Sequence, residues 1–200
     1  MRERIKAAAR GIALVAIAPT LVSFAIRARL MGRDRALQSS AEWLALIPGL
    51  TGQYLRRAFY NRALASCEHT VVIEAGTVFC RAGTRLDAHA YIGGGCRLGL
   101  VHVEHDVLIA SGVHIPSGAS THEIGDPTVP IREQARGETL VRIGAGAWIG
   151  EGALVMADVG RESVIGAGAV VTRRIPSWSI AAGVPARVLR PRPGAHVKSV

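Results

Sequence analysis

A six-residue period governs the second half of this chain. In VRIGAGAWIGEGALV, residues 141–155, an aliphatic residue returns at every sixth position as Ile143, Ile149 and Val155. This period matches neither an α-helix, which repeats about every 3.6 residues, nor a plain strand, which alternates about every two. It indicates that each unit is one segment of a larger stack of similar units.

The period extends over residues 71–176. The apolar residues at the repeated position form five series: Ile73 and Phe79; Leu86, Ile92 and Leu98; Val103, Ile109 and Ile115; Ile143, Ile149 and Val155; Val159, Ile165 and Val171. We interpret each hexad as a short strand plus a corner, with the apolar side chain stacked inward on its equivalents. Three hexads close a triangular coil, and an apparent loop at 117–140 interrupts the stack, so the sequence predicts a parallel β-helix of about four to five coils.

Irregular steps and glycines fit the corners of such a coil. The steps from 79 to 86, 98 to 103 and 155 to 159 break the period, and we interpret them as small corner insertions or deletions. Gly144-x-Gly146 and Gly166-x-Gly168 lack the strand–turn–helix setting of a phosphate-binding loop, so we expect them to form tight corners.

Composition agrees with a narrow, all-β prism. Hydrophobic residues make up 49% of the chain and aromatic residues only 4%, with 23 glycines. The three cysteines, Cys67, Cys80 and Cys96, are odd in number and form no CxxC pair, which favours buried thiols in a reducing compartment.

Residues 1–36 form a separate apolar segment with basic flanks. The run GIALVAIAPTLVSFAI, residues 11–26, carries no charge, and arginines stand on both sides of it. It is shorter than the roughly 20 residues that span a bilayer, and Pro19 at its middle would kink a helix. We expect it to lie on an anionic membrane surface. A buried helix, a signal peptide and a true span are the alternatives.

Residues 37–70 are predicted to form a helical linker. Ser39 and Glu42 make a capping box, which predicts a helix start at Ser39, and Pro48-Gly49 should end that helix. A second helix is expected over about 51–65, with Leu55, Phe59 and Ala63 on one face. Its other large side chains belong to a solvated linker or, alternatively, face a ligand: Tyr54, Arg56, Arg57 and Tyr60.

The net charge of +9 favours partners that carry phosphate. Nucleic acid is not expected, because no recognition-helix or zinc-finger pattern is present. The Lys and Arg residues cluster at the two ends of the chain, and residues 193–200 form a basic tail. The expected partner of the basic residues is therefore an anionic membrane or a phosphorylated ligand.

The segment IGAGAWIGEGALVMADVGRESVIGAGAVVTRRIPSWSIAAGVPARVLR resembles the left-handed β-helix, hexapeptide-repeat acyltransferases. VEHDVLIASGVHIPSG and the following STHEIGDPTVPI extend the resemblance, which covers about residues 70–192. LIPGLTGQYLRRAFY is similar to members found in bacterial polysaccharide biosynthesis.

This resemblance implies a left-handed parallel β-helix over 71–192, preceded by helices. It further implies a homotrimer with active sites between adjacent prisms, and acetyl-CoA or a longer acyl-CoA as donor, without a metal. The expected reaction is O- or N-acetylation of a sugar or polysaccharide precursor. With the basic N-terminal segment, the expected location is cytoplasmic, peripheral on the inner face of the cytoplasmic membrane.

The reaction needs a base for the acceptor, and histidine suits this role because it titrates near neutral pH. The resemblance implies that His122 is this base, with His114 as second choice. Glu123 or Asp126 could orient the ring, although a charged loop residue is an equal reading. Trp148 is expected near the donor–acceptor pocket or, alternatively, at the trimer seam.

Coenzyme A should follow the prism wall. Small residues would admit its pantetheine arm, and arginines would bind its phosphates, or anionic lipid in the alternative reading. The residues implied for coenzyme A are Gly150, Ala167, Thr172, Arg173, Arg187 and Arg190.

Two other functions are compatible with a β-helix. A γ-carbonic-anhydrase-like zinc site needs a histidine pair five residues apart, but His102 and His105 are three apart, and His114 and His122 eight. A non-catalytic scaffold or membrane-binding module is the other alternative, and the set of His, Trp and Arg residues argues against it.

Overall fold

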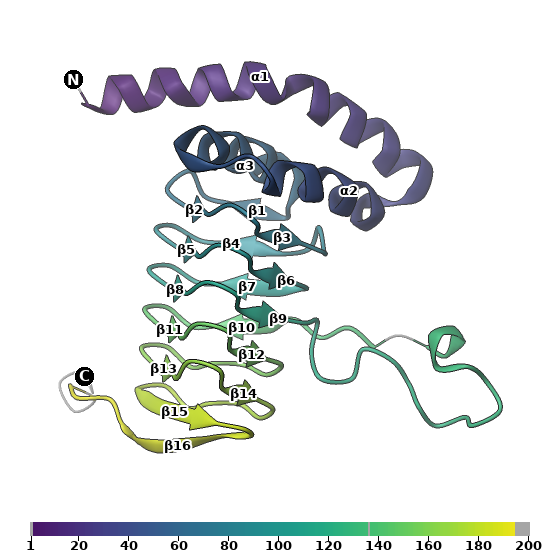
Figure 1. Cartoon of the computed structure of the whole chain (residues 1–200), viewed down its shortest axis with the longest axis vertical. Helices are drawn as coiled ribbons and strands as arrows, with labels where there is room; N and C mark the ends of the chain where they lie inside the picture. The colour runs from purple at the N-terminus through teal and green to yellow at the C-terminus, as the bar shows by residue number, and fades with distance from the viewer. Residues whose placement is uncertain (1, 136, 195–200) are drawn as a thin grey trace.

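The computed structural model describes residues 2–135 and 137–194. Three helices lie at one end of a three-sided parallel β-helix, and a hairpin lies at the other (Figure 1). A long loop projects from one side of the prism. The architecture confirms the predicted parallel β-helix with N-terminal helices.

Three sheets, here named A, B and C, form the sides of the prism. Sheet A contains β1 (Ser66–Cys67), β4 (Arg85–Leu86), β7 (Val101–Val103) and β10 (Val141–Ile143). Sheet B contains β2 (Val72–Ile73), β5 (Tyr91–Ile92), β8 (Leu108–Ile109), β11 (Trp148–Ile149), β13 (Val164–Ile165), β15 (Ser179–Gly183) and β16 (Ala186–Pro191). Sheet C contains β3 (Val78–Phe79), β6 (Arg97–Leu98), β9 (His114–Ile115), β12 (Leu154–Val155) and β14 (Val170–Val171).

The residues at the repeated position fill the interior, as predicted. In sheet B, Ile92, Ile109, Ile149 and Ile165 are in parallel register, and each is at most 1% exposed. The two-residue strands of sheet B each contribute one inward side chain, so a single coil could not bury its apolar residues without its neighbours.

The predicted number of coils is too low. In sheet B, six parallel strands stack within the described residues: β2, β5, β8, β11, β13 and β15. The stack begins at β1, before residue 71, and continues to β15, after residue 176. The inward residues there are Cys67 and Ala181, which are smaller than the aliphatic side chains that mark the repeat elsewhere.

The corners differ in regularity. The B–C edge, which joins sheet B to sheet C, has a glycine with positive φ in each turn: Gly76, Gly95, Gly112, Gly152 and Gly168. The C–A edge, which joins sheet C to sheet A, comprises residues 80–84, 99–100, 116–140, 156–158 and 172–174. All three irregular steps of the repeat, and the long loop, fall at the C–A edge.

Two helices cover the first coil, and a third lies over them. The three are α1 (Arg2–Met31), α2 (Arg33–Ala45) and α3 (Gly49–Ala63). Phe59 of α3 makes edge-to-face contacts with Phe24 of α1, at 5.5 Å between ring centroids, and with Tyr60, at 5.4 Å. Tyr60 in turn contacts Phe79 of the prism at 4.8 Å, so the aromatic side chains join the helices to the β-helix.

The helix start predicted at Ser39 is wrong. α2 runs through this position from Arg33, and Gly32, with φ of 88°, separates it from α1. The hydroxyl of Ser40 donates to the carbonyl of Ala36 at 3.1 Å and accepts from Nη2 of Arg27 at 2.7 Å. Since Ser39 also accepts from Arg27, both serines bind neighbours inside the helical layer instead of capping a helix end.

The helix α1 crosses the top of the molecule and continues through Pro19 (Figure 1). Residues Ala7–Met31 form a helix long and apolar enough to cross a membrane by length and composition, with 17% of its most apolar window buried. Its exposed apolar side chains share one helical face: Ile12, Val15, Val22, Ile26 and Leu30. The helix is therefore not buried as a whole in one chain.

The last strands reverse direction. β16 pairs antiparallel with β15, and Arg192 then ties the hairpin to the preceding coil through Glu162, at 2.9 Å. Within the described chain the cysteines are free thiols, and burial raises the pKa of Cys67 to about 12. Most of the basic tail, residues 195–200, lies outside the described residues.

Candidate functional site

The long loop between β9 and β10 carries His122. It contains a short 3-10 helix, Ile131–Glu133, and is closed by backbone bonds from Thr139 to Ser117 and from Glu123 to Ala135, both 2.9 Å. These contacts hold the loop as a defined excursion at the C–A edge.

The His122 ring is half-buried within this loop. Its Nδ1 atom is buried and has no hydrogen-bond partner within the described part of the chain. Because a buried polar atom without a partner is costly, Nδ1 is a position where a further polar group would be stabilising.

Neither carboxylate suggested as an orienting group is hydrogen-bonded to His122 in the described residues. Asp126 accepts hydrogen bonds from the backbone N–H of Thr128 at 2.8 Å and from its hydroxyl at 2.6 Å, and these bonds lower the pKa of Asp126. Glu123 is exposed.

His114, the second choice for the base, faces outward from sheet C. It is exposed and stands in register with Arg97 of β6 and Leu154 of β12. It therefore lies on the outer face of sheet C, in the strand that leads into the loop that holds His122.

Trp148 belongs to an apolar ladder on the outer face of sheet B. Tyr91, Leu108 and Trp148 are in register and are 38%, 45% and 51% exposed. A row of large exposed apolar side chains on a sheet is typical of a surface that another surface covers.

The small residues at the B–C edge pack closely. A Cβ atom at Gly150 would lie 2.5 Å from the backbone nitrogen of Ala167 in the next coil. One at Gly166 would lie 2.8 Å from the Cβ of Ala182, which pairs with Arg187 of β16. Gly150, Ala167 and Arg187 thus lie toward the B–C edge. A glycine is required at position 150 for packing as well, because a Cβ atom there would clash with the next coil.

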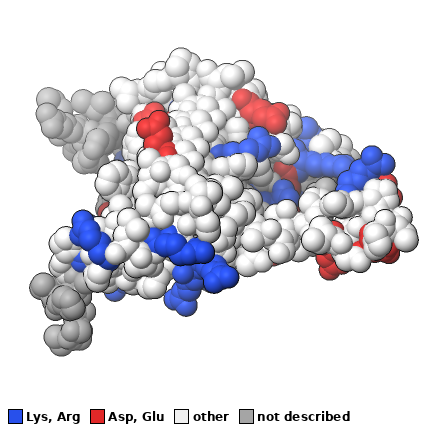
Figure 2. Space-filling view, turned by 60° about the horizontal axis from the view of Figure 1, so that its bottom comes forward, with Lys and Arg blue, Asp and Glu red and all other residues white. Residues whose placement is uncertain are grey.

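The predicted arginines are exposed at the C-terminal end of the prism. Figure 2 shows basic side chains gathered over this end. Its exposed arginines are Arg161, Arg173, Arg174, Arg187 and Arg190. Thr172 and Arg173 follow β14 at the C–A edge, whereas Arg190 pairs with Ile180 in sheet B. The arrangement provides several uncovered cations for an anionic ligand.

In one chain the predicted site residues form two separate groups. The C–A edge, which carries His122, lies across the prism from sheet B, which carries Trp148. In Figure 1 the loop projects on the side away from β11. A site that contains both residues needs the loop of one chain and sheet B of another.

The histidines do not assemble as metal ligands in the described residues. No group of three or more His, Cys, Asp or Glu there is positioned to hold a metal ion. His102, one of the histidines considered for zinc, instead pairs through Nε2 with Asp87 at 3.0 Å.

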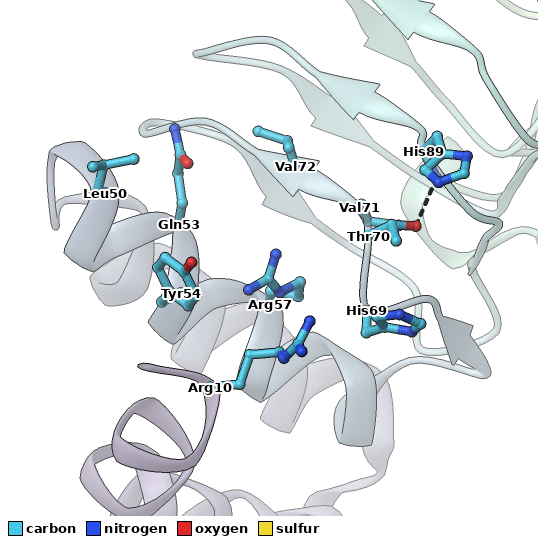
Figure 3. Close-up of a pocket in the computed structure, with 10 residues that line it drawn as sticks. All are labelled: Arg10, Leu50, Gln53, Tyr54, Arg57, His69, Thr70, Val71, Val72 and His89. Carbon is cyan, nitrogen blue, oxygen red and sulfur yellow. Dashed lines mark hydrogen bonds between the residues drawn. The ribbon is translucent and has the colours of Figure 1, made fainter. Parts of the chain in front are cut away.

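A second feature was only partly anticipated from the sequence. A cavity of about 520 Å³ lies between α1, α3 and the first coil, lined by Arg10, Tyr54, Arg57 and His69 among others (Figure 3). Of the side chains suggested to face a ligand, Tyr54 and Arg57 line it, but Arg56 and Tyr60 are fully buried.

Comparison with known proteins identifies relatives of one kind. A probable acetyltransferase of Mycobacterium tuberculosis is 42% identical over 46% of this chain and 31% of its own length. Galactoside O-acetyltransferase of Escherichia coli is 48% identical over 44% of this chain and 45% of its own length. A putative acetyltransferase of Saccharomyces cerevisiae is 32% identical over 64% and 66%. No family model matches the chain.

Solved structures share the fold. A maltose O-acetyltransferase from Clostridium difficile superposes with a TM-score of 0.67 at 21% identity, covering 80% of this chain and 88% of that one. An N-acyltransferase from Bacillus cereus, in complex with dTDP and coenzyme A, gives 0.53 at 18% identity, covering 62% and 70%. The chain spans about a third of the mycobacterial relative and under half of the galactoside enzyme.

Proposed function

Because the chain belongs to the hexapeptide-repeat acyltransferases with a left-handed β-helix, we propose that it transfers an acetyl group from acetyl-CoA to a sugar or polysaccharide precursor. The acceptor group is a hydroxyl or an amine. The names of the galactoside and maltose enzymes support a sugar acceptor, and the coenzyme A complex of the Bacillus enzyme supports the donor.

The observation that carries this proposal is the setting of His122. The ring lies half-buried in a defined loop, with one nitrogen buried and unpartnered in the described residues of a single chain. A polar group from a neighbouring chain or the acceptor would complete it. A half-buried imidazole is suited to exchange a proton with an acceptor bound beside it.

The proposed reaction is a nucleophilic substitution at the thioester. His122 takes the proton from the acceptor hydroxyl as its oxygen bonds to the acetyl carbonyl carbon. The carbon–sulfur bond then breaks, and the histidine returns the proton to the coenzyme A thiolate. A backbone N–H of the prism wall would stabilise the negative oxygen of the intermediate.

The donor would lie along the B–C edge. Gly150 and Ala167 leave a wall of backbone groups without large side chains, and Arg187 and Arg190 are exposed nearby for phosphates. Thr172 and Arg173, at the C–A edge, would bind the donor from a second chain. Trp148 would lie close to both substrates.

The proposed assembly is a homotrimer on a membrane. Three chains would bring each His122 loop to the sheet B face of a neighbour and cover its apolar ladder. The apolar face of α1 and the flanking arginines support association with an anionic membrane, on the inner face of the cytoplasmic membrane.

The test is acetyl transfer by the purified full-length protein. Labelled acetyl-CoA is incubated with a panel of galactosides, maltose and lipid-linked sugars, and labelled product is measured with thiol release. His122→Ala should lower kcat by about 10²–10⁴-fold, the usual contribution of a general base. Acetyl-CoA affinity should stay near that of the wild type.

His114→Ala is the matched control, because it removes an exposed histidine of sheet C that is outside the loop itself. It should leave kcat within about twofold of the wild type, as expected for a surface residue. Equal activity of His122→Ala and wild type would remove His122 from the mechanism. A wild-type protein that binds acetyl-CoA and acetylates nothing would favour a scaffold.

A further inference from the structure

We propose that the groove between α1, α3 and the first coil binds the phosphate group of an anionic lipid. Figure 3 shows the side chains of Arg10 of α1 and Arg57 of α3 extending into one space, which His69 of the β1–β2 turn also lines. The cavity of about 520 Å³ has room for a phosphate and the glycerol attached to it.

Two cations of this groove are unpaired. Arg10 and Arg57 are half-buried, and neither forms an ion pair with a described residue. Arg57 instead lies over the Tyr54 ring, 4.7 Å from its centroid, which holds the guanidinium in place while its N–H groups stay available. Two guanidinium groups on facing helices are suited to bind one phosphate from both sides.

The acidic groups nearby have other partners. Glu68 lies 3.7 Å from His69, and Asp106 lies 3.4 Å from His89. Glu74 accepts a hydrogen bond from Gln53 at 2.8 Å and a longer one from Tyr91 at 3.4 Å. None of these carboxylates lines the cavity, so among the described residues Arg10 and Arg57 have no ion-pair partner.

The groove continues between the helices into a second cavity with apolar and basic side chains in its wall. This second cavity of about 230 Å³ shares four residues with the first, and it adds Gly11, Leu14 and Ala58 together with the polar Asn61 and Arg62. On the outer side of α1, Ile12 and Val15 are 70% and 76% exposed. A charged head beside apolar side chains fits a phosphate that carries a hydrocarbon chain better than it fits free phosphate.

This inference does not depend on acetyl transfer, since the groove lies at the helical end, above the loop that carries His122 (Figure 1). It does rest on the proposed membrane location of α1. If the ligand binds, it fixes which edge of the prism faces the membrane surface.

The test measures separately how much the phosphate head and the hydrocarbon chains of the lipid contribute to binding. The full-length protein in a neutral detergent is titrated with dioleoyl phosphatidic acid, with dioleoylglycerol, which lacks the phosphate, and with glycerol 3-phosphate, which lacks the chains. Native mass spectrometry counts what each chain retains. We expect saturable binding of one phosphatidic acid per chain, and at least about tenfold weaker binding of the other two, which each lack one set of contacts.

Arg10→Gln and Arg57→Gln should each weaken retention of phosphatidic acid by about tenfold, as expected when a charge-assisted hydrogen bond is lost. Arg29→Gln is the matched control, because it removes an exposed arginine from α1 outside the groove, and retention should not change. Circular dichroism melting curves check that each variant is folded.

Three results would overturn the proposal. Equal retention of phosphatidic acid and dioleoylglycerol would exclude phosphate recognition. Equal affinity for glycerol 3-phosphate and phosphatidic acid would replace the lipid by a soluble phosphate. Folded Arg10 and Arg57 variants with wild-type retention would exclude this groove.

Discussion

Arg56 and Arg57 are adjacent on α3 but have opposite environments. Arg56 is fully buried and donates to the carbonyls of Ile73 at 3.0 Å, Leu44 at 3.1 Å and Ile47 at 2.6 Å. Burial lowers the pKa of Arg56. One side chain thus joins α2, α3 and the first coil, whereas its neighbour faces the groove.

Replacing Arg56 should therefore test how the helices are attached. Arg56→Met leaves the carbonyls of Ile73 and Ile47 without a donor, whereas Leu44 still accepts from the backbone N–H of Ile47 at 3.3 Å. At about 1–3 kcal/mol for each lost partner, the free energy of unfolding should fall by at least about 2 kcal/mol. Arg57→Met is the control and should cost less than about 1 kcal/mol, the contribution of its contact with Tyr54. Urea denaturation measures both. Similar losses for the two variants would contradict the structural role of Arg56.

Sequence reasoning found single residues better than the relations between them. It put His122 on a loop, because a loop between periodic segments is visible in the sequence. It did not reveal that the Asp126 carboxylate accepts hydrogen bonds from Thr128. Nor did it join Arg10, Arg57 and His69, since they come from three elements and no local pattern connects them.

At the level of elements, α1 has two different faces. Ala13, Ile17 and Phe24 are buried, on the side toward the other helices, while Val15 and Val22 on the opposite face are 76% and 60% exposed. Such a helix can remain packed on the prism while its outer face contacts lipid. The exposed valines can therefore be changed without disturbing the packed face.

The double variant Val15→Asp, Val22→Asp should leave the membrane fraction. Each aspartate costs about 2.5–3.5 kcal/mol in a hydrocarbon environment and less at its boundary, so membrane-bound protein should fall by at least about tenfold. Ile124→Asp, at an equally exposed position in the loop, is the control and should stay bound. Flotation with anionic vesicles measures the distribution. Unchanged flotation of the double variant would show that α1 does not contact the lipid.

Most strands were predictable because one position in six must be apolar. The two missed strands and the wrong helix start each have a physical reason. Cys67 and Ala181 also stand six residues from the inward positions Ile73 and Ile175, but they are small, so β1 and β15 were missed. The capping box at Ser39 was a local signal that packing against Arg27 overrode.

For the whole molecule, the separation of His122 from Trp148 predicts an assembly. Light scattering in mild detergent should give the mass of three chains of 21.1 kDa. Because each site would combine the loop of one chain with sheet B of another, mixed trimers should regain activity that the parent variants lack.

His122→Ala and Trp148→Ala should each be impaired alone, for loss of the base and of a substrate contact. Co-expressed, they should recover activity at about a quarter of the sites, where both residues are intact. Two copies of His122→Ala, co-expressed under separate tags, control for expression level. Activity no greater than the average of the separate variants, or a purely monomeric protein, would contradict sites shared between chains.

The two ends of the prism have a consequence for growth of the stack. A stack of parallel coils could in principle continue to grow at either end, since each terminal coil offers unpaired N–H and C=O groups to any other β-strand. Here α2 and α3 cover the first coil, and β16 runs antiparallel beneath β15, a direction that the parallel ladder does not continue. Both devices act against end-to-end polymerisation into fibres, so the number of coils is a property of the single chain.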